Sequence, residues 1–197
     1  MGRRLLVNFK AVPRGPAGAS GRARITIIKL FIFNIMSLQN PAMTDRFRYY
    51  LRVRYAECDA QKVVFNARYA DYVDLSTSEF LRALGFGEAL VDGTLDYQLV
   101  KQTVEWKAPA RFDQVLEIAV SAKHLGNTSF TLLTEFRLAG EERILATAET
   151  VYVFVEAHTL KKMPLPPDFR AALERGAPNL AIDHAGYLPP QLHRFNS

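Results

Sequence analysis

The densest group of residues that could do chemistry is the segment from Tyr55 to Tyr69. Within it, Asp59 stands seven residues ahead of Asn66, where a helix is predicted to begin. A helix start offers free backbone N–H groups and the positive end of the helix dipole. A carboxylate beside such donors suits acyl transfer, because the donors hold an oxyanion while the carboxylate attacks the carbonyl or activates water.

A plainer interpretation of the same segment stays open on composition alone. In it, Asp59 only caps a turn and residues 63–65 only fill the core. Glu57 and Lys62 could form an ion pair or line a pocket. Cys58 is the only cysteine in the chain, and without a convincing histidine partner we expect it to be an inert thiol.

Other reactive motifs are missing from the sequence. It contains no Gly-rich phosphate loop, no Gly-x-Ser-x-Gly elbow and no His-Glu-x-x-His. A single cysteine excludes a disulfide scaffold and a multi-cysteine zinc site. The histidines lack the spacing of ligands or bases, so we expect surface residues and no metal site; they are His124, His158, His184 and His193.

Hydrophobic periodicity predicts the elements that must position this segment. Residues 66–85 carry apolar residues at three- and four-residue steps, which predicts one long helix capped by Asn66 and stopped by Gly85. Alternating patterns predict strands over residues 47–55, 96–108, 114–125, 128–139 and 143–157, and a short helix is predicted over 168–175. This order predicts an α+β fold with a five-stranded antiparallel sheet. One face and the edges of such a sheet need cover, so we expect a dimer.

The positive charge of the chain is confined to one end. Of 25 basic residues, seven lie in residues 1–43, which contain no Asp or Glu. Subtracting them leaves 18 basic against 20 acidic residues, so the rest gives no sign of a nucleic-acid partner. The apolar run 25–36 is shorter than the roughly 20 residues of a membrane span.

We therefore expect three parts: a basic tail at 1–43, a domain at 44–175, and a loosely ordered extension at 176–197. The tail could be an upstream reading of the gene before Met36 or Met43, an unstructured extension or a targeting segment. A real membrane or nucleic-acid role for the tail is the remaining alternative.

Residues 46–173 resemble the hotdog-fold acyl-CoA thioesterases, specifically the 4-hydroxybenzoyl-CoA thioesterase group. The residues in register with the motif of that group are Tyr55, Glu57, Cys58, Asp59, Val64, Phe65, Asn66 and Tyr69. The resemblance implies a five-stranded antiparallel sheet wrapped around one long central helix.

The resemblance also implies roles for particular residues. Asp59 would be the catalytic carboxylate, as nucleophile or general base, and the backbone N–H of Asn66 would polarise the carbonyl. The side chain of Asn66 could also orient water or substrate. Members of the group use no metal or redox cofactor, and their active sites lie at the interfaces of homodimers, often within homotetramers. A cytoplasmic location is expected.

Two positions depart from the motif. Lys62 stands where the group has Gly, and it could contact a CoA phosphate. Thr77 stands where relatives often carry Arg. Phe65, Tyr69, Tyr72 and Trp106 could line an aromatic acyl pocket or belong to the core.

Four functions follow for testing. The first is hydrolysis of an acyl-CoA thioester, or of an acyl-carrier-protein thioester, and the second is a non-catalytic binder of the same ligands. A hotdog dehydratase or hydratase is the third, although no histidine lies in the segment to serve it. The fourth, a nucleic-acid or membrane protein, is suggested only by the overall charge.

Overall fold

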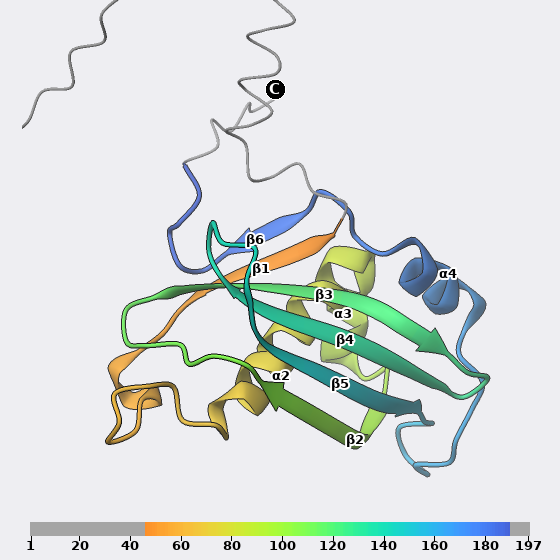
Figure 1. Cartoon of the computed structure of the whole chain (residues 1–197). Coiled ribbons are helices and arrows are strands. Elements are labelled where there is room, and N and C mark those ends of the chain that lie inside the picture. The colour runs from red at the N-terminus through yellow and green to blue at the C-terminus, as the bar shows by residue number, and fades with distance from the viewer. Residues whose placement is uncertain (1–45, 190–197) are drawn as a thin grey trace, which may run out of the picture. The chain divides into compact units, whose positions relative to one another are not determined.

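The computed structural model describes residues 46–189, so the predicted basic tail lies outside the described residues. Figure 1 shows a strongly twisted sheet with helices against it. In chain order the elements are β1 (Phe47–Arg52), η1 (Tyr55–Glu57), α2 (Arg68–Leu81), η2 (Arg82–Phe86), α3 (Gly87–Asp92), β2 (Tyr97–Trp106), β3 (Val115–Leu125), β4 (Ser129–Leu138), β5 (Ile144–Phe154), α4 (Pro167–Arg175) and β6 (Ala181–Asp183).

The sheet has six strands in the order β2-β5-β4-β3-β1-β6. All five predicted strands are present, and β3, β4 and β5 pair antiparallel in chain order. The α+β hotdog architecture is therefore confirmed, but the count of five strands was wrong. β6 adds a sixth, parallel to β1, inside the extension that we expected to be loosely ordered. Three residues are too few to show an alternating pattern, so sequence reasoning had no signal for this strand.

The core lies between α2 and one face of the sheet (Figure 1). The predicted apolar stripe of α2 is buried there, and Tyr69 and Phe80 make ring contacts with the sheet. The ring centroids of Tyr69 and Phe136 are 5.2 Å apart, and those of Phe80 and Phe47 are 5.4 Å apart. This packing fixes the start of α2 against the sheet.

The long helix is shorter than predicted at both ends. The α-helix begins at Arg68 instead of Asn66, because the side-chain Oδ1 of Asn66 accepts a hydrogen bond from the adjacent Ala67 N–H (2.9 Å) instead of capping a later turn. At the other end, α2 passes into the π-helical turn η2, where Gly85 has φ of 98° and bends the chain into α3. Glycine adopts this left-handed conformation without steric cost.

Residues 181–189, which we call the C-terminal strap, cover the edge of β1. The backbone N–H of His184 donates to the carbonyl oxygen of Tyr50 (3.0 Å), and the ring of Tyr187 stacks on that of Tyr50 with centroids 5.3 Å apart. Within the strap, Asp183 accepts hydrogen bonds from the Ala185 and Leu188 amides at 2.9 and 2.8 Å. The strap thus protects the strand edge that the predicted fold left open.

Candidate active site

Asp59 opens a tight hairpin between η1 and α2, here called the Asp59 hairpin (residues 58–64). The Asp59 N–H donates to the Val63 carbonyl oxygen and the Lys62 N–H donates to the Asp59 carbonyl oxygen, both at 2.9 Å. Cys58 and Val64 form an antiparallel bridge below this loop. A three-residue hairpin loop of this kind ends in a left-handed residue. That residue is Lys62, with φ of 63°, so the lysine adopts the conformation for which the motif's glycine is suited.

Glu57 ties the hairpin to α2. Its Oε2 accepts hydrogen bonds from the Tyr72 hydroxyl (2.8 Å) and from the Arg54 N–H (2.6 Å). Its backbone oxygen accepts from the Phe65 N–H (2.9 Å), just beyond the hairpin. Burial, and then the hydrogen bond to Glu57, raises the pKa of the Tyr72 hydroxyl, so Tyr72 stays a neutral donor. These bonds hold both ends of the hairpin.

The Asp59 carboxylate is half-buried and has one oxygen available. Oδ1 accepts a hydrogen bond from the Gln61 N–H at 2.8 Å. Within residues 46–189, Oδ2 has no hydrogen-bond or ion-pair partner. One oxygen therefore orients the group, and the other is free for a substrate or a water molecule.

One backbone amide near the start of α2 is left without an acceptor among the described residues. The amides of Phe65, Arg68, Tyr69 and Ala70 donate to carbonyl oxygens, and the amide of Ala67 donates to the Asn66 side chain. The Asn66 N–H alone among residues 65–70 has no acceptor in the described chain. A free amide at a helix start is the donor that an oxyanion requires.

A cavity of about 460 Å³, here called the Asn66 pocket, brings these groups together. Four of the predicted site residues line it, namely Asp59, Phe65, Asn66 and Tyr69. The fifth, Lys62, does not line this pocket and instead borders a second recess. Tyr72 is buried in the core.

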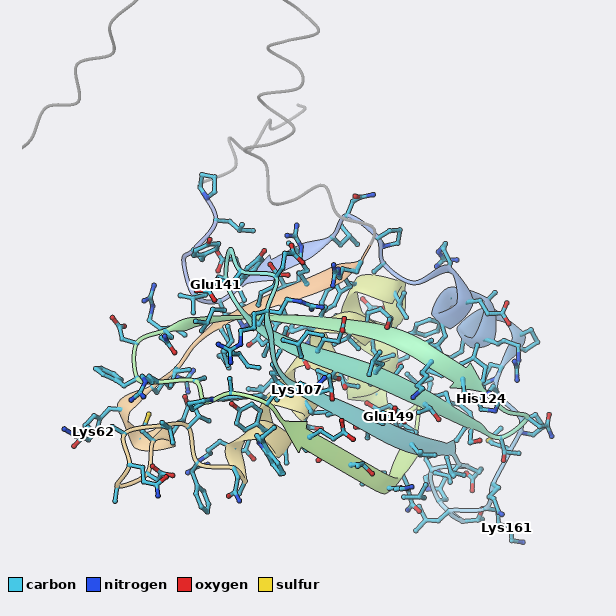
Figure 2. All side chains as sticks on the ribbon, in the orientation of Figure 1. Lys62, Lys107, His124, Glu141, Glu149 and Lys161 are labelled. Atoms are coloured by element: carbon cyan, nitrogen blue, oxygen red, sulfur yellow. The ribbon has the colours of Figure 1, made fainter. Side chains whose placement is uncertain are left out.

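The end of β2 supplies a wall of the Asn66 pocket that the sequence predicts only in part. Trp106 is a predicted candidate for an acyl pocket and Lys107 is not, and both line the Asn66 pocket. The indole of Trp106 meets the Tyr69 ring edge to face, with centroids 6.1 Å apart. No motif marks Lys107, because only the topology brings the end of β2 beside the start of α2. Figure 2 shows Lys107 and Lys62 well separated in that view.

The part of the chain that the structure describes holds neither a cluster of metal ligands nor a membrane-spanning helix. Among residues 46–189, no three His, Cys, Asp or Glu side chains are grouped as metal ligands would be. No helix in the same range is long and apolar enough to cross a membrane.

Comparison with known proteins identifies the family. Residues 53–173 match the model of the thioesterase-like superfamily. The acyl-CoA thioester hydrolase YbgC of Escherichia coli O6:H1 is 32% identical over 133 residues, which cover 67% of this chain and 98% of that protein. A putative esterase of Aquifex aeolicus is 29% identical over 60% of this chain and 91% of its own length.

Solved structures agree with this assignment. A gentisyl-coenzyme A thioesterase superposes with a TM-score of 0.57 at 29% identity, covering 64% of this chain and 98% of that chain. The PA5185 protein of Pseudomonas aeruginosa shares the fold, with a TM-score of 0.62 at 24% identity over 68% of this chain and 92% of that one. The chain belongs to the thioesterase-like superfamily of hotdog proteins, and it is a thioester hydrolase.

Proposed function

We propose that this enzyme hydrolyses acyl-CoA thioesters to free acid and CoA, using the Asp59 carboxylate and the Asn66 backbone amide. The observation that carries the proposal is the pairing of a free carboxylate oxygen with a free helix-start amide in one pocket. The similarity to the acyl-CoA thioester hydrolase YbgC of Escherichia coli supports the same substrate class.

Two chemical routes are compatible with this pair. In the first, Asp59 attacks the thioester carbon, the C–S bond breaks, and the CoA thiolate leaves and takes up a proton. Water then cleaves the resulting mixed anhydride and restores the carboxylate. In the second, Asp59 takes a proton from water as the oxygen of that water adds to the carbon, and the tetrahedral intermediate expels the thiolate. The Asn66 N–H holds the oxyanion in both routes, a donor worth about a hundredfold to a thousandfold in rate.

The two routes differ in where the oxygen of the product acid originates. In a single turnover in ¹⁸O-labelled water with enzyme in excess, unlabelled product acid identifies attack by Asp59. Attack by Asp59 leaves the product of the first turnover with an oxygen from the carboxylate whenever water attacks the aspartyl carbon of the anhydride. Direct attack by water always labels the product in that turnover.

The aromatic side chains in the Asn66 pocket suit a ring-bearing acyl group. Phe65 and Trp106 are 48% and 51% exposed, so they are available as pocket walls, whereas Tyr69 is almost completely buried behind them. Apolar and aromatic walls with a few polar groups are typical of small-molecule sites. The gentisyl-coenzyme A thioesterase, with its aromatic acyl substrate, supports this extension of the proposal.

A second copy of the chain is part of the proposal. β2 is an edge strand of the described sheet, and it exposes Leu99 and Val100 beside the exposed Leu75 of α2. An unpaired edge with apolar side chains favours pairing with another strand. We expect a homodimer or homotetramer by light scattering, and Val100→Lys should shift it toward monomer. A cytoplasmic location remains a prediction.

The proposal is tested with purified protein and a panel of short, long, branched and aromatic acyl-CoAs. CoA release should be fast for at least one class. Asp59→Asn should lower turnover roughly a hundredfold to ten-thousandfold while the circular dichroism spectrum stays that of the parent. Near-normal turnover in this variant would refute the role of Asp59.

A non-catalytic binder is the alternative function, and Lys62 in place of the motif's glycine favours it. The hairpin around Lys62 nevertheless keeps the left-handed conformation that glycine would adopt, so the substitution leaves Asp59 in a regular three-residue loop. Tight binding of acyl-CoA without release of acid would favour the binder over the enzyme.

A further inference from the structure

A second recess shares one lining residue, Asp59, with the Asn66 pocket. Its volume is about 450 Å³. The residues around it are mostly apolar and come from η1, the Asp59 hairpin and the turn before β3; they are Tyr55, Ala56, Cys58, Asp59, Ala60, Lys62 and Phe112. Gln61 and Val63 line the Asn66 pocket, whereas Ala60 and Lys62 line the recess, so the Asp59 hairpin lies between the two cavities.

The recess is walled by two exposed aromatic rings. Tyr55 is 82% exposed and Phe112 is 54% exposed, and their rings meet edge to face with centroids 5.9 Å apart. Neither ring belongs to the hydrophobic core. Paired aromatic rings that remain in solvent offer faces on which a flat heterocyclic base can stack, a contact worth about 1–3 kcal/mol per base.

One cation without an ion-pair partner borders these rings, and two more are their neighbours in the chain. Arg54 precedes Tyr55 in the chain, Arg111 precedes Phe112, and Lys62 borders the recess itself. Within residues 46–189 none of the three forms an ion pair. Figure 2 shows Lys62 at the outer end of the loop with its side chain directed away from the sheet. The recess has Asp59 as its one lining carboxylate and Lys62 as its one lining cation, and this flexible lysine can meet a phosphate as a point charge.

The backbone at Lys62 is unfavourable for a lysine. A left-handed conformation costs a residue with a side chain about 1–2 kcal/mol, and φ at Lys62 is 63°. The Lys62 side chain makes no hydrogen bond or ion pair with the rest of the described chain that would offset this cost. Uncompensated strain of this kind is concentrated at ligand sites.

We propose that this recess holds the adenine nucleotide of CoA, with the base on Tyr55 and Phe112 and the phosphates near Lys62. CoA joins its thioester to an adenosine 3′-phosphate 5′-diphosphate through a long flexible arm. An arm that passes around the Asp59 hairpin lets one molecule place its thioester at Asp59 and its base in the recess. The inference rests on the proposed function. It also predicts that the enzyme prefers acyl-CoA thioesters to acyl-carrier-protein thioesters, because the latter have the same arm without the nucleotide.

Binding of adenosine 3′,5′-bisphosphate tests the recess without any catalysis. Calorimetry with the full chain should show binding that Tyr55→Ala and Lys62→Gly each weaken roughly tenfold. Glycine suits the left-handed position, so Lys62→Gly removes the cation without adding strain. Lys161→Ala is the matched control, an exposed lysine in the loop after β5 that should bind like the parent. Equal binding by the parent, Tyr55→Ala and Lys62→Gly would overturn the proposal.

Kinetics separate this inference from the proposed function. The same acid is supplied as its CoA thioester and as its N-acetylcysteamine thioester, which lacks the nucleotide. Tyr55→Ala and Lys62→Gly should raise KM for the CoA thioester about tenfold while kcat holds, and the loss should be confined to that substrate. Equal losses on both thioesters, or no loss on either, would overturn the nucleotide site. Failure of the parent enzyme to hydrolyse either thioester would refute the proposed function, and bisphosphate binding would then decide the recess by itself.

Discussion

The Asp59 hairpin and the C-terminal strap are built on the same local turn but leave different atoms free. In each, an aspartate Oδ1 accepts a hydrogen bond from the amide two residues later, Gln61 at 2.8 Å and Ala185 at 2.9 Å. The second oxygen of Asp183 accepts from the Leu188 amide, whereas the second oxygen of Asp59 has no partner in the described chain. A fully satisfied carboxylate stabilises a turn, and a half-satisfied one beside a pocket is available for chemistry.

The same kind of hydrogen bond, from a tyrosine hydroxyl to a glutamate, lies next to each of the two segments. The Tyr72 hydroxyl donates to Glu57 at 2.8 Å beside the hairpin, and the Tyr50 hydroxyl donates to Glu117 at 2.9 Å beneath the strap. Burial raises the pKa of both hydroxyls, with the neighbouring carboxylate as the second cause. Matched substitutions in the two segments can therefore separate positioning of a reactive group from stabilisation of the fold.

The largest difference is expected between the two aspartates. Asp59→Asn should lower turnover roughly a hundredfold to ten-thousandfold and change the free energy of unfolding little, because the amide oxygen can still accept from the Gln61 N–H. Asp183→Asn replaces one of two engaged acceptors with an NH₂ group, so it should lower the free energy of unfolding by about 1–3 kcal/mol with normal kcat. Urea unfolding and CoA release measure the two effects. A fall in kcat for Asp183→Asn as large as that for Asp59→Asn would break the distinction between the segments.

The tyrosine hydroxyls should give the next largest difference. Tyr72→Phe and Tyr50→Phe each remove a hydrogen bond to a carboxylate, and each should lower the free energy of unfolding by about 1–2 kcal/mol. Only Tyr72→Phe should also slow turnover, by about tenfold, because it releases Glu57 and lets the hairpin shift. Parallel kinetic assays of the two variants check this. Equal kinetic effects would show that the hairpin gains nothing special from its anchor.

High pH should remove the stabilising contribution of the neutral Tyr50 hydroxyl reversibly and without a mutation, with a smaller effect than the substitutions above. The pKa of Tyr50 is above its usual value of 10 in the folded state, so at high pH the unfolded chain loses this proton first. The stability contributed by the neutral hydroxyl is thus fully present below about pH 10 and is lost as the pH rises through the raised pKa. The gap in unfolding free energy between the parent and Tyr50→Phe should therefore narrow above that pH. Urea titrations from pH 8 upward measure it, and a widening gap would contradict the stated cause of the shift.

How much of this arrangement the sequence predicts depends on the length of the pattern involved. Alternation over ten or so residues predicted β2 to β5, and helical spacing predicted α2. The pairing of β2 with β5 was not predicted. β6 and α3 were missed, because three and six residues carry little periodicity. The motif pointed to Asp59 and Asn66, but whether an oxygen or an amide is left free depends on every neighbouring hydrogen bond. Lys107 reaches the pocket only through the order of strands in the sheet.

The smallest expected effect concerns the left-handed residue that each segment contains. The strap has Gly186 at φ of 65°, with open space where a Cβ would lie, and the hairpin has Lys62 at φ of 63°. Lys62→Gly relieves the steric cost but loosens the unfolded chain, so a gain in stability of up to about 1 kcal/mol is expected. Gly186→Lys makes the reverse change at an unhindered site and should lose a similar amount.

Thermal and urea unfolding of the two variants test whether Lys62 is retained for its side chain. If Lys62→Gly raises the free energy of unfolding and Gly186→Lys lowers it by a similar amount, both positions respond only to the backbone conformation. The hairpin then carries a steric cost that the strap avoids. This is the result expected if Lys62 serves a ligand. A loss of stability in Lys62→Gly would mean instead that the lysine holds the hairpin together. Strain at Lys62 would then no longer support the nucleotide recess, and the proposal would depend on the aromatic pair and the neighbouring cations.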